Sequence, residues 1–205
     1  MEKKKKEVSE IRTLLENIKK ISYIKPNEIP NIDLYMDQVT SFMEKQLKST
    51  KRNTDDKILT KTMINNYAKN DLLPPPTKKK YSKEHLLVLT FIYYFKNILS
   101  MKDIQMVLGP ITEKYFESTG SINIARVYDE VCAFELERTK ILQKDIEVMY
   151  NNSLETFLDV PEEDRETLQQ FAFICTLSLD VYVKKLLLEK LIDELLESKD
   201  EKKKK

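Results

Sequence analysis

The side chains best suited to chemistry lie between Thr60 and Tyr81, and the chemistry that they suit is recognition rather than catalysis. A short helix over 61–70 would turn five polar or basic residues outward: Lys61, Thr62, Asn65, Asn66 and Lys69. An asparagine amide can form paired hydrogen bonds with the edge of an adenine, and a lysine ammonium can contact guanine or phosphate. We therefore predict that this helix face contacts duplex DNA. The alternative is that its amides are only exposed polar groups.

Three consecutive lysines, Lys78, Lys79 and Lys80, form a second candidate contact. They follow three prolines, which lack the backbone N–H and keep the chain extended. Residues 57–83 contain seven lysines and one acidic residue, a net charge of +6, while the whole chain carries +1. A locally basic segment of this kind is typical of a nucleic-acid footprint. We predict a basic wing at 77–81 that contacts phosphates, the alternative being a solvated run of charge.

The sequence contains no comparable set of residues for catalysis or for metal binding. His85 is the only histidine, and no serine, cysteine or carboxylate lies at a spacing that would combine with it. Cys132 and Cys175 lie among apolar residues and are expected to be free, buried thiols in a reducing cytoplasm. Two glycines are too few for a phosphate-binding loop of the usual form. We expect no enzymatic activity, no cofactor and no metal.

The apolar stretches indicate a protein without a membrane segment. The first ten residues, "MEKKKKEVSE", lack the apolar core of a signal peptide. The longest apolar runs, "LLVLTFIYYF" and "TLQQFAFICTLSL", are too short to cross a bilayer and read as core helices. The expected location is the cytoplasm.

Helices must position these side chains, because the scarcity of glycine makes tight turns rare. We predict an all-α fold with a small β wing, in which an N-terminal winged helix-turn-helix domain precedes a C-terminal helical region. Thr60, Ser82 and Ser100 are the expected N-caps of three successive helices, and Gly109-Pro110 is expected to stop the third. The other predicted helices cover 7–21, 33–47, 121–151 and a last region after Pro161, with a polar, mobile loop at 48–56. The predicted divisions are 1–29 (basic tail and first helix), 30–118 (winged domain), 119–198 (helical region) and 199–205 (lysine-rich tail).

The two C-terminal helices are expected to bury more apolar surface than one small domain can cover. The helix at 121–151 has a near-heptad seam of six residues: Ile124, Val127, Val131, Phe134, Ile141 and Val148. Between Leu168 and Leu196 one apolar face comprises Phe171, Ile174, Leu177, Val181, Leu188 and Ile192, and a second comprises Cys175, Leu179, Tyr182 and Leu186. A helix that is apolar on most sides must be buried in a bundle or against another subunit. We predict a homodimer through these helices. The alternative is a monomer in which the helix at 7–21 folds back over the second face.

The order of elements between Thr60 and Leu108 resembles the winged helix-turn-helix of the MerR family of bacterial regulators. The residues that carry this resemblance are "T-x-x-x-I-N-N-Y", "D-L-L-P-P", "K-K-Y-S-K-E-H-L" and "L-S-M-K-D-I-Q-M-V-L". The stretch from about Ile29 to Pro110 is still more similar to the Firmicute family called domain of unknown function 1836, whose members are placed beside MerR-type domains. The resemblance implies a winged fold that binds DNA. This chain has Asn65, Asp71 and Lys79 where the MerR pattern has an arginine, a glycine and a second arginine.

Two functions remain open at this stage. The first is a DNA-binding transcriptional regulator, which the net charge of +6 over 57–83 favours. The second is a non-enzymatic interaction module on a winged scaffold that no longer binds DNA, which the missing arginine at Asn65 favours. Lysine still neutralises phosphate, but it lacks the two-pronged geometry of arginine.

Overall fold

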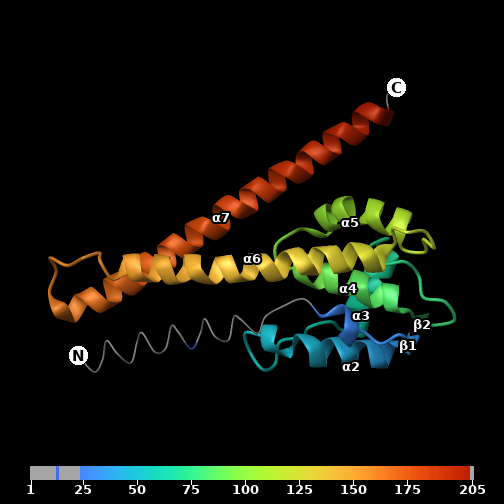
Figure 1. Cartoon of the computed structure of the whole chain (residues 1–205), viewed down its shortest axis with the longest axis horizontal. Helices are drawn as coiled ribbons and strands as arrows, with labels where there is room; N and C mark the ends of the chain where they lie inside the picture. Colours follow the sequence, from blue (N-terminus) through green and yellow to red (C-terminus); the bar gives the residue numbers. More distant parts are fainter. Residues whose placement is uncertain (1–12, 14–23, 204–205) are drawn as a thin grey trace. The chain divides into compact units, whose positions relative to one another are not determined.

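The computed structural model of the chain describes residue 13 and residues 24–203, with side chains to residue 198 (Figure 1). The N-terminal lysine tail and the predicted helix at 7–21, apart from residue 13, lie outside the described residues, whereas the backbone of the C-terminal tail is described to residue 203 as the end of a helix. Six α-helices and a two-stranded sheet form the described part, so the mostly helical fold with a small β element is confirmed. The residues up to Glu135 form one compact unit and those from Leu136 a second. The division therefore falls within a long helix.

The first unit contains most of the secondary structure. After the 3-10 turn η1 (Pro26–Glu28), the order is β1 (Leu34–Tyr35), α2 (Met36–Leu47), η2 (Lys48–Thr50), α3 (Lys61–Lys69), β2 (Lys80–Tyr81), α4 (Lys83–Phe95) and α5 (Met101–Tyr115). The start of α6 (Ile124–Ser153) completes the unit, and α7 (Glu162–Lys203) lies in the second.

Helix α4 is the centre of the first unit, because every residue from His85 to Tyr93 is buried. The apolar run predicted a core helix, and this is confirmed. Around α4 lie the buried faces of the neighbouring helices, of which Met43, Ile64 and Ile104 are fully covered. Burying side chains of this size stabilises a fold by about 1.5–3 kcal/mol each.

The sheet differs from the predicted wing in its partners. Strand β2 pairs antiparallel with β1, with Leu34 opposite Tyr81 and Tyr35 opposite Lys80. Residues 33–35 were expected to begin a helix, whereas Leu34 and Tyr35 form a strand and the helix starts at Met36. The local apolar spacing suits a helix, but the distant lysine segment supplies backbone partners that favour a strand. In Figure 1 the two strands lie beside the start of α2.

Helix α5 continues through the expected stop at Gly109-Pro110 and ends at Tyr115. A proline ring ordinarily collides with the Cβ of the preceding residue, and Gly109 has no Cβ. The hydroxyl of Thr112 donates to the carbonyls of Leu108 and Gly109, at 3.2 and 2.9 Å. The prediction that the helix stops at Gly109-Pro110 is therefore wrong.

Helix α6 buries only the first residue of the predicted seam, Ile124, together with residues outside that seam. Tyr128 and Cys132 are buried one and two turns after Ile124, and the Tyr128 hydroxyl donates to the carbonyl of Ile24 at 2.6 Å. Phe134, by contrast, is 66% exposed. The residues Ile124, Tyr128 and Cys132 are four apart, so the buried face is a short row at the start of the helix and not a heptad seam along its length.

The second unit is a helical hairpin. The side-chain amide of Gln169 on α7 donates to the carbonyls of Leu154 and Thr156 in the connecting loop, at 2.7 and 2.9 Å. The rings of Tyr150 and Phe173 pack edge to face with centroids 5.3 Å apart. These contacts join the end of α6 to the beginning of α7.

Candidate nucleic-acid interface

Helix α3 begins where the sequence predicts, at a threonine cap. The Thr60 hydroxyl accepts a hydrogen bond from the backbone N–H of Met63 at 3.2 Å, which satisfies one of the free donors at the helix start. Ile64 and Tyr67 are buried and fix the helix to the core, while Met63 is half-buried. The opposite face is exposed at every predicted position: Lys61, Thr62, Asn65, Asn66 and Lys69.

The end of α3 is also as predicted. Asn70 is the C-cap, and Asp71 follows in a left-handed conformation with φ of 53°. The backbone N–H groups of Leu72 and Leu73 both donate to the carbonyl of Tyr67, at 2.9 and 3.3 Å. Leu72 and Leu73 are fully buried, so the chain is anchored immediately before the three prolines carry it away from the helix.

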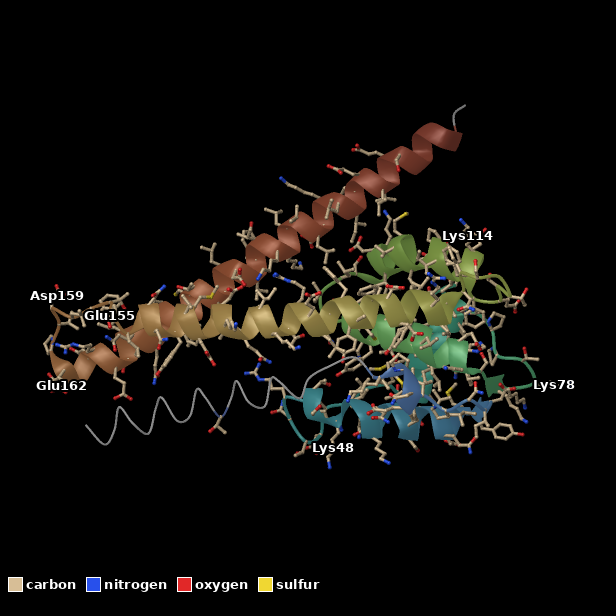
Figure 2. All side chains as sticks on the ribbon, viewed as in Figure 1. Lys48, Lys78, Lys114, Glu155, Asp159 and Glu162 are labelled. Carbon is tan, nitrogen blue, oxygen red and sulfur yellow. The ribbon has the colours of Figure 1, made fainter. Side chains whose placement is uncertain are left out.

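The lysine segment forms a tight turn at the start of β2. The N–H of Lys80 donates to the carbonyl of Thr77 at 3.0 Å, and the two residues between them have φ of 52° (Lys78) and 64° (Lys79). Positive φ at both central positions is the pattern of the hairpin turns that normally use asparagine and glycine. A side chain with a Cβ in this conformation costs about 1–2 kcal/mol. The fold therefore holds two exposed lysines at a turn tip in an unfavourable backbone conformation. Figure 2 labels the first of them, Lys78.

Helix α2 links the two candidate contact elements, because it packs against α3 and against both strands. The exposed face of α3 and the turn at Thr77–Lys80 thus belong to one compact unit. We call the exposed residues Lys61, Thr62, Asn65, Asn66, Lys69, Lys78 and Lys79 the basic surface.

Two of the eight predicted contacts have partners within the fold. The ammonium of Lys61 pairs with the carboxylate of Asp37 at the start of α2. The ammonium of Lys80 lies 5.3 Å from the centroid of the Tyr35 ring, and its side chain is only half-exposed. Lys80 therefore packs on the sheet, whereas Lys78 and Lys79 project from it.

Tyr35 and Asp37 were not foreseen as part of this region. Tyr35 is 54% exposed beside Lys80, and its backbone N–H donates to the side chain of Gln38 at 2.8 Å. No local signal marks these residues, because Tyr35 meets Lys80 through the pairing of β1 with β2, and Asp37 meets Lys61 where α2 packs against α3.

His85 has a structural position in the first turn of α4. Its Nδ1 accepts a hydrogen bond from the backbone N–H of Ser82 at 3.0 Å, which caps the helix. The rings of Tyr81 and Phe116 pack edge to face against the imidazole, with centroids at 5.4 and 4.8 Å. Burial lowers the pKa of His85, while the backbone of Pro75 and Pro74 and the charges of Glu84 and Asp33 act in the opposite direction.

The lowered pKa of His85 predicts a loss of stability in mild acid. The unfolded chain takes up a proton near pH 6.5, whereas the folded chain resists protonation, so the stabilisation is complete above about pH 6.5 and is lost as the pH falls below it. Denaturant unfolding at about pH 7.5 and about pH 5.5 should show this loss. The variant His85→Gln retains a side-chain acceptor for the Ser82 N–H and removes the titrating group. It should lose less stability over the same interval, and an equal loss would exclude His85 as the cause.

We next consider metal ligands, thiols and membrane-spanning helices among the described residues. Within the described residues, no group of three or more histidine, cysteine, aspartate or glutamate side chains is arranged to hold a metal ion. Both cysteines are free thiols; Cys132 is buried as expected, and burial raises its pKa to about 11. The expectation that Cys175 is also buried is wrong, because its side chain is exposed on α7. None of the described helices combines the length and apolar character that a membrane span requires.

Comparison with known proteins places the chain in a family. The family model of domain of unknown function 1836 matches residues 24–131, which include the whole basic surface and all of α2 to α5. No curated protein and no solved structure matches the chain. The family match covers more than half of the sequence and agrees with the resemblance seen in its motifs. The chain belongs to the family of domain of unknown function 1836.

Proposed function

We propose that this protein is a DNA-binding transcriptional regulator that reads duplex DNA with α3 and contacts the flanking phosphates with the lysine turn. The observation that supports this most strongly is the arrangement of the basic surface. One face of α3 is anchored by Ile64 and Tyr67, and the other exposes amides and ammonium groups. A capped second helix that enters the major groove, with a basic element on the neighbouring backbone, is a recurrent docking geometry.

The turn adds a second argument. A sequence selected only for stability would place asparagine or glycine at positions with positive φ, and this chain places Lys78 and Lys79 there. Unfavourable backbone conformations persist in proteins where they serve a function. Phosphate binding is a function that two adjacent, exposed ammonium groups perform directly.

The amides of α3 give a prediction about choice of sequence. Asn65→Ala or Asn66→Ala should weaken binding to the preferred site by about 1–3 kcal/mol if the amide makes a paired base contact. Binding to random duplex DNA should barely change. Competition binding with a selected site and a scrambled duplex measures both affinities.

Thr62→Ala provides a matched control on the same face, because it removes an exposed polar group that lacks the paired geometry of an amide. Equal losses on the selected and the scrambled duplex would mean that the asparagines do not read bases.

We further propose that the protein acts as a homodimer through α7. This helix exposes ten large apolar side chains at 40–65%: Phe171, Ile174, Leu179, Val181, Tyr182, Val183, Leu186, Leu187, Leu191 and Leu195. A contiguous apolar patch larger than about a few hundred Å² is rare on a monomer. A second copy covers such a surface with an identical one, and two-fold symmetry would present two α3 helices to a palindromic site.

The exposed residues of α7 also support the second candidate function, a protein-interaction module without DNA binding. In that case a different protein, and not a second copy of this chain, would cover the exposed apolar residues of α7. The two candidates differ in a direct way, because only the regulator requires the basic surface. Loss of the lysine turn would leave the partner binding of an interaction module unchanged.

A further inference from the structure

A cleft of about 430 Å³ lies in the first unit, between the loop that follows η2 and the C-terminal end of α4. Four cationic side chains line it: Lys51, Arg52, Lys57 and Lys96. Asp56 is the one acidic residue among the lining residues. The volume falls within the range of small-molecule sites, which is about 300–1,000 Å³.

The acidic residue of the cleft is engaged by its own loop. The Asp56 carboxylate accepts a hydrogen bond from the backbone N–H of Asn53 at 2.8 Å, and the N–H of Asp56 donates back to the Asn53 carbonyl at 3.1 Å. Hydrogen bonding from the Asn53 backbone lowers the pKa of Asp56, so the carboxylate is ionised while it closes the loop. It balances only part of the positive charge around the cleft.

Lys96 is half-buried at the C-terminal end of α4. Its ammonium donates to the carbonyl of Ile58 at 2.6 Å and lies 4.9 Å from the centroid of the Tyr93 ring. Both partners are uncharged, and the carboxylates of the described residues form no ion pair with Lys96. Burial lowers the pKa of Lys96, which reflects the cost of holding its charge away from water. An anion in the cleft would offset that cost.

The other cations surround the same space from the loop. Lys51 is paired with Glu44 of α2, which fixes the direction of its side chain. Arg52 and Lys57 are exposed, and in the sequence one precedes Asp56 and the other follows it. Positive groups therefore approach the cleft both from the loop and from the end of α4. A planar carboxylate accepts hydrogen bonds mostly in one plane, whereas a phosphate presents three acceptor oxygens in different directions.

We propose that this cleft binds a small phosphorylated molecule, with Lys96 and Arg52 as its principal phosphate contacts. The assignment is independent of DNA binding, because the cleft shares no residue with the basic surface. The loop that forms it continues through the buried residues Ile58 and Leu59 to the cap of α3 at Thr60.

The test is calorimetric titration of the full-length protein with inorganic pyrophosphate. Arg52→Gln and Lys96→Met should each weaken binding by tenfold or more, because each removes one charge-assisted contact. Lys48→Met removes an exposed lysine of the neighbouring turn η2, outside the cleft, and should leave the affinity within a factor of about two. Circular dichroism of each variant checks that α4 and the loop still fold. Arg52 is the decisive position if Lys96→Met unfolds the loop.

Three outcomes would overturn the proposal. The first is pyrophosphate binding that is undetectable or that is equally affected by Lys48→Met. The second is citrate binding as tight as that of pyrophosphate, which would exclude a phosphate preference. The third is a loss of duplex DNA binding in Arg52→Gln and Lys96→Met with unchanged pyrophosphate binding, which would assign the cleft to the DNA surface.

Discussion

Replacing Lys78 and Lys79 with asparagine and glycine is expected to make the protein more stable and to weaken its binding to duplex DNA. The two lysines occupy the central positions of a turn with φ of 52° and 64°. Asparagine and glycine adopt this conformation at little cost, so the free energy of unfolding should rise by about 1–2 kcal/mol. The same change removes two exposed ammonium groups. Opposite effects on stability and on binding distinguish a contact surface from a structural turn.

Salt dependence gives the size of the binding effect. The slope of log affinity against log salt should flatten by roughly 0.9 for each lost phosphate contact, or about 1.8 for the two lysines. Lys140→Ala with Lys144→Ala on α6 removes the same charge from exposed positions of the second unit and should leave the slope nearly unchanged. An unchanged slope in the turn variant, or an equal change in the α6 variant, would exclude the lysine turn as a DNA contact. Lys80→Ala should have a smaller effect on the slope, because its ammonium packs on Tyr35.

The largest expected effect on assembly comes from charges placed on the apolar side of α7. Tyr182 and Leu186 are 62% and 40% exposed, and they lie one turn apart on the same face. If a second copy covers this face, Tyr182→Glu with Leu186→Glu should convert a dimer into a monomer, because burying two carboxylates without partners is strongly unfavourable. Light scattering should give about twice 24.3 kDa for the unchanged protein and 24.3 kDa for the variant.

The control for this variant adds the same two charges at polar positions. Gln170→Glu with Thr176→Glu changes exposed residues of the same helix and should leave the dimer intact. A mass of 24.3 kDa for the unchanged protein at every concentration would contradict the dimer. It would also leave the apolar surface of α7 to a different partner, as the interaction-module alternative requires.

Local signals predicted α3 and its surface well. The Thr60 cap, the buried pair Ile64 and Tyr67, and the left-handed residue at Asp71 are properties of a ten-residue stretch and its immediate flanks. Capping and amphipathic spacing act over a single helical turn, so they can be recognised without knowledge of the remaining fold.

Features that depend on distant residues were not predictable in the same way. Leu34 and Tyr35 form a strand only because Lys80 and Tyr81 pair with them. The heptad spacing on α6 predicted a long seam, but Phe134 is exposed and Tyr128 is the residue that inserts into the core. Periodicity shows that a helix has an apolar face, and it does not show which part of that face finds a partner.

The charge interactions of the basic surface also depend on distant residues, and the sequence did not predict them. Nothing in the sequence distinguishes Lys61 and Lys80 from the other lysines of residues 57–83. Only the folded chain reveals that one is paired with Asp37 and the other lies over Tyr35. The basic cleft near Lys96 is also invisible in the sequence, because Arg52 and Lys96 lie on a loop and a helix end that are separated by the whole of α3 and β2.

The most direct test of the central claim is equilibrium binding of the purified protein to pooled genomic duplex fragments across a range of salt concentrations. A regulator that docks through the basic surface should bind, and its log affinity should fall linearly with log salt with a slope set by about 0.9 per phosphate contact. Sequencing of the fragments that remain bound at the higher salt concentrations should then recover a shared site. The absence of binding at low salt, where every phosphate contact is strongest, would contradict the account and favour the interaction module.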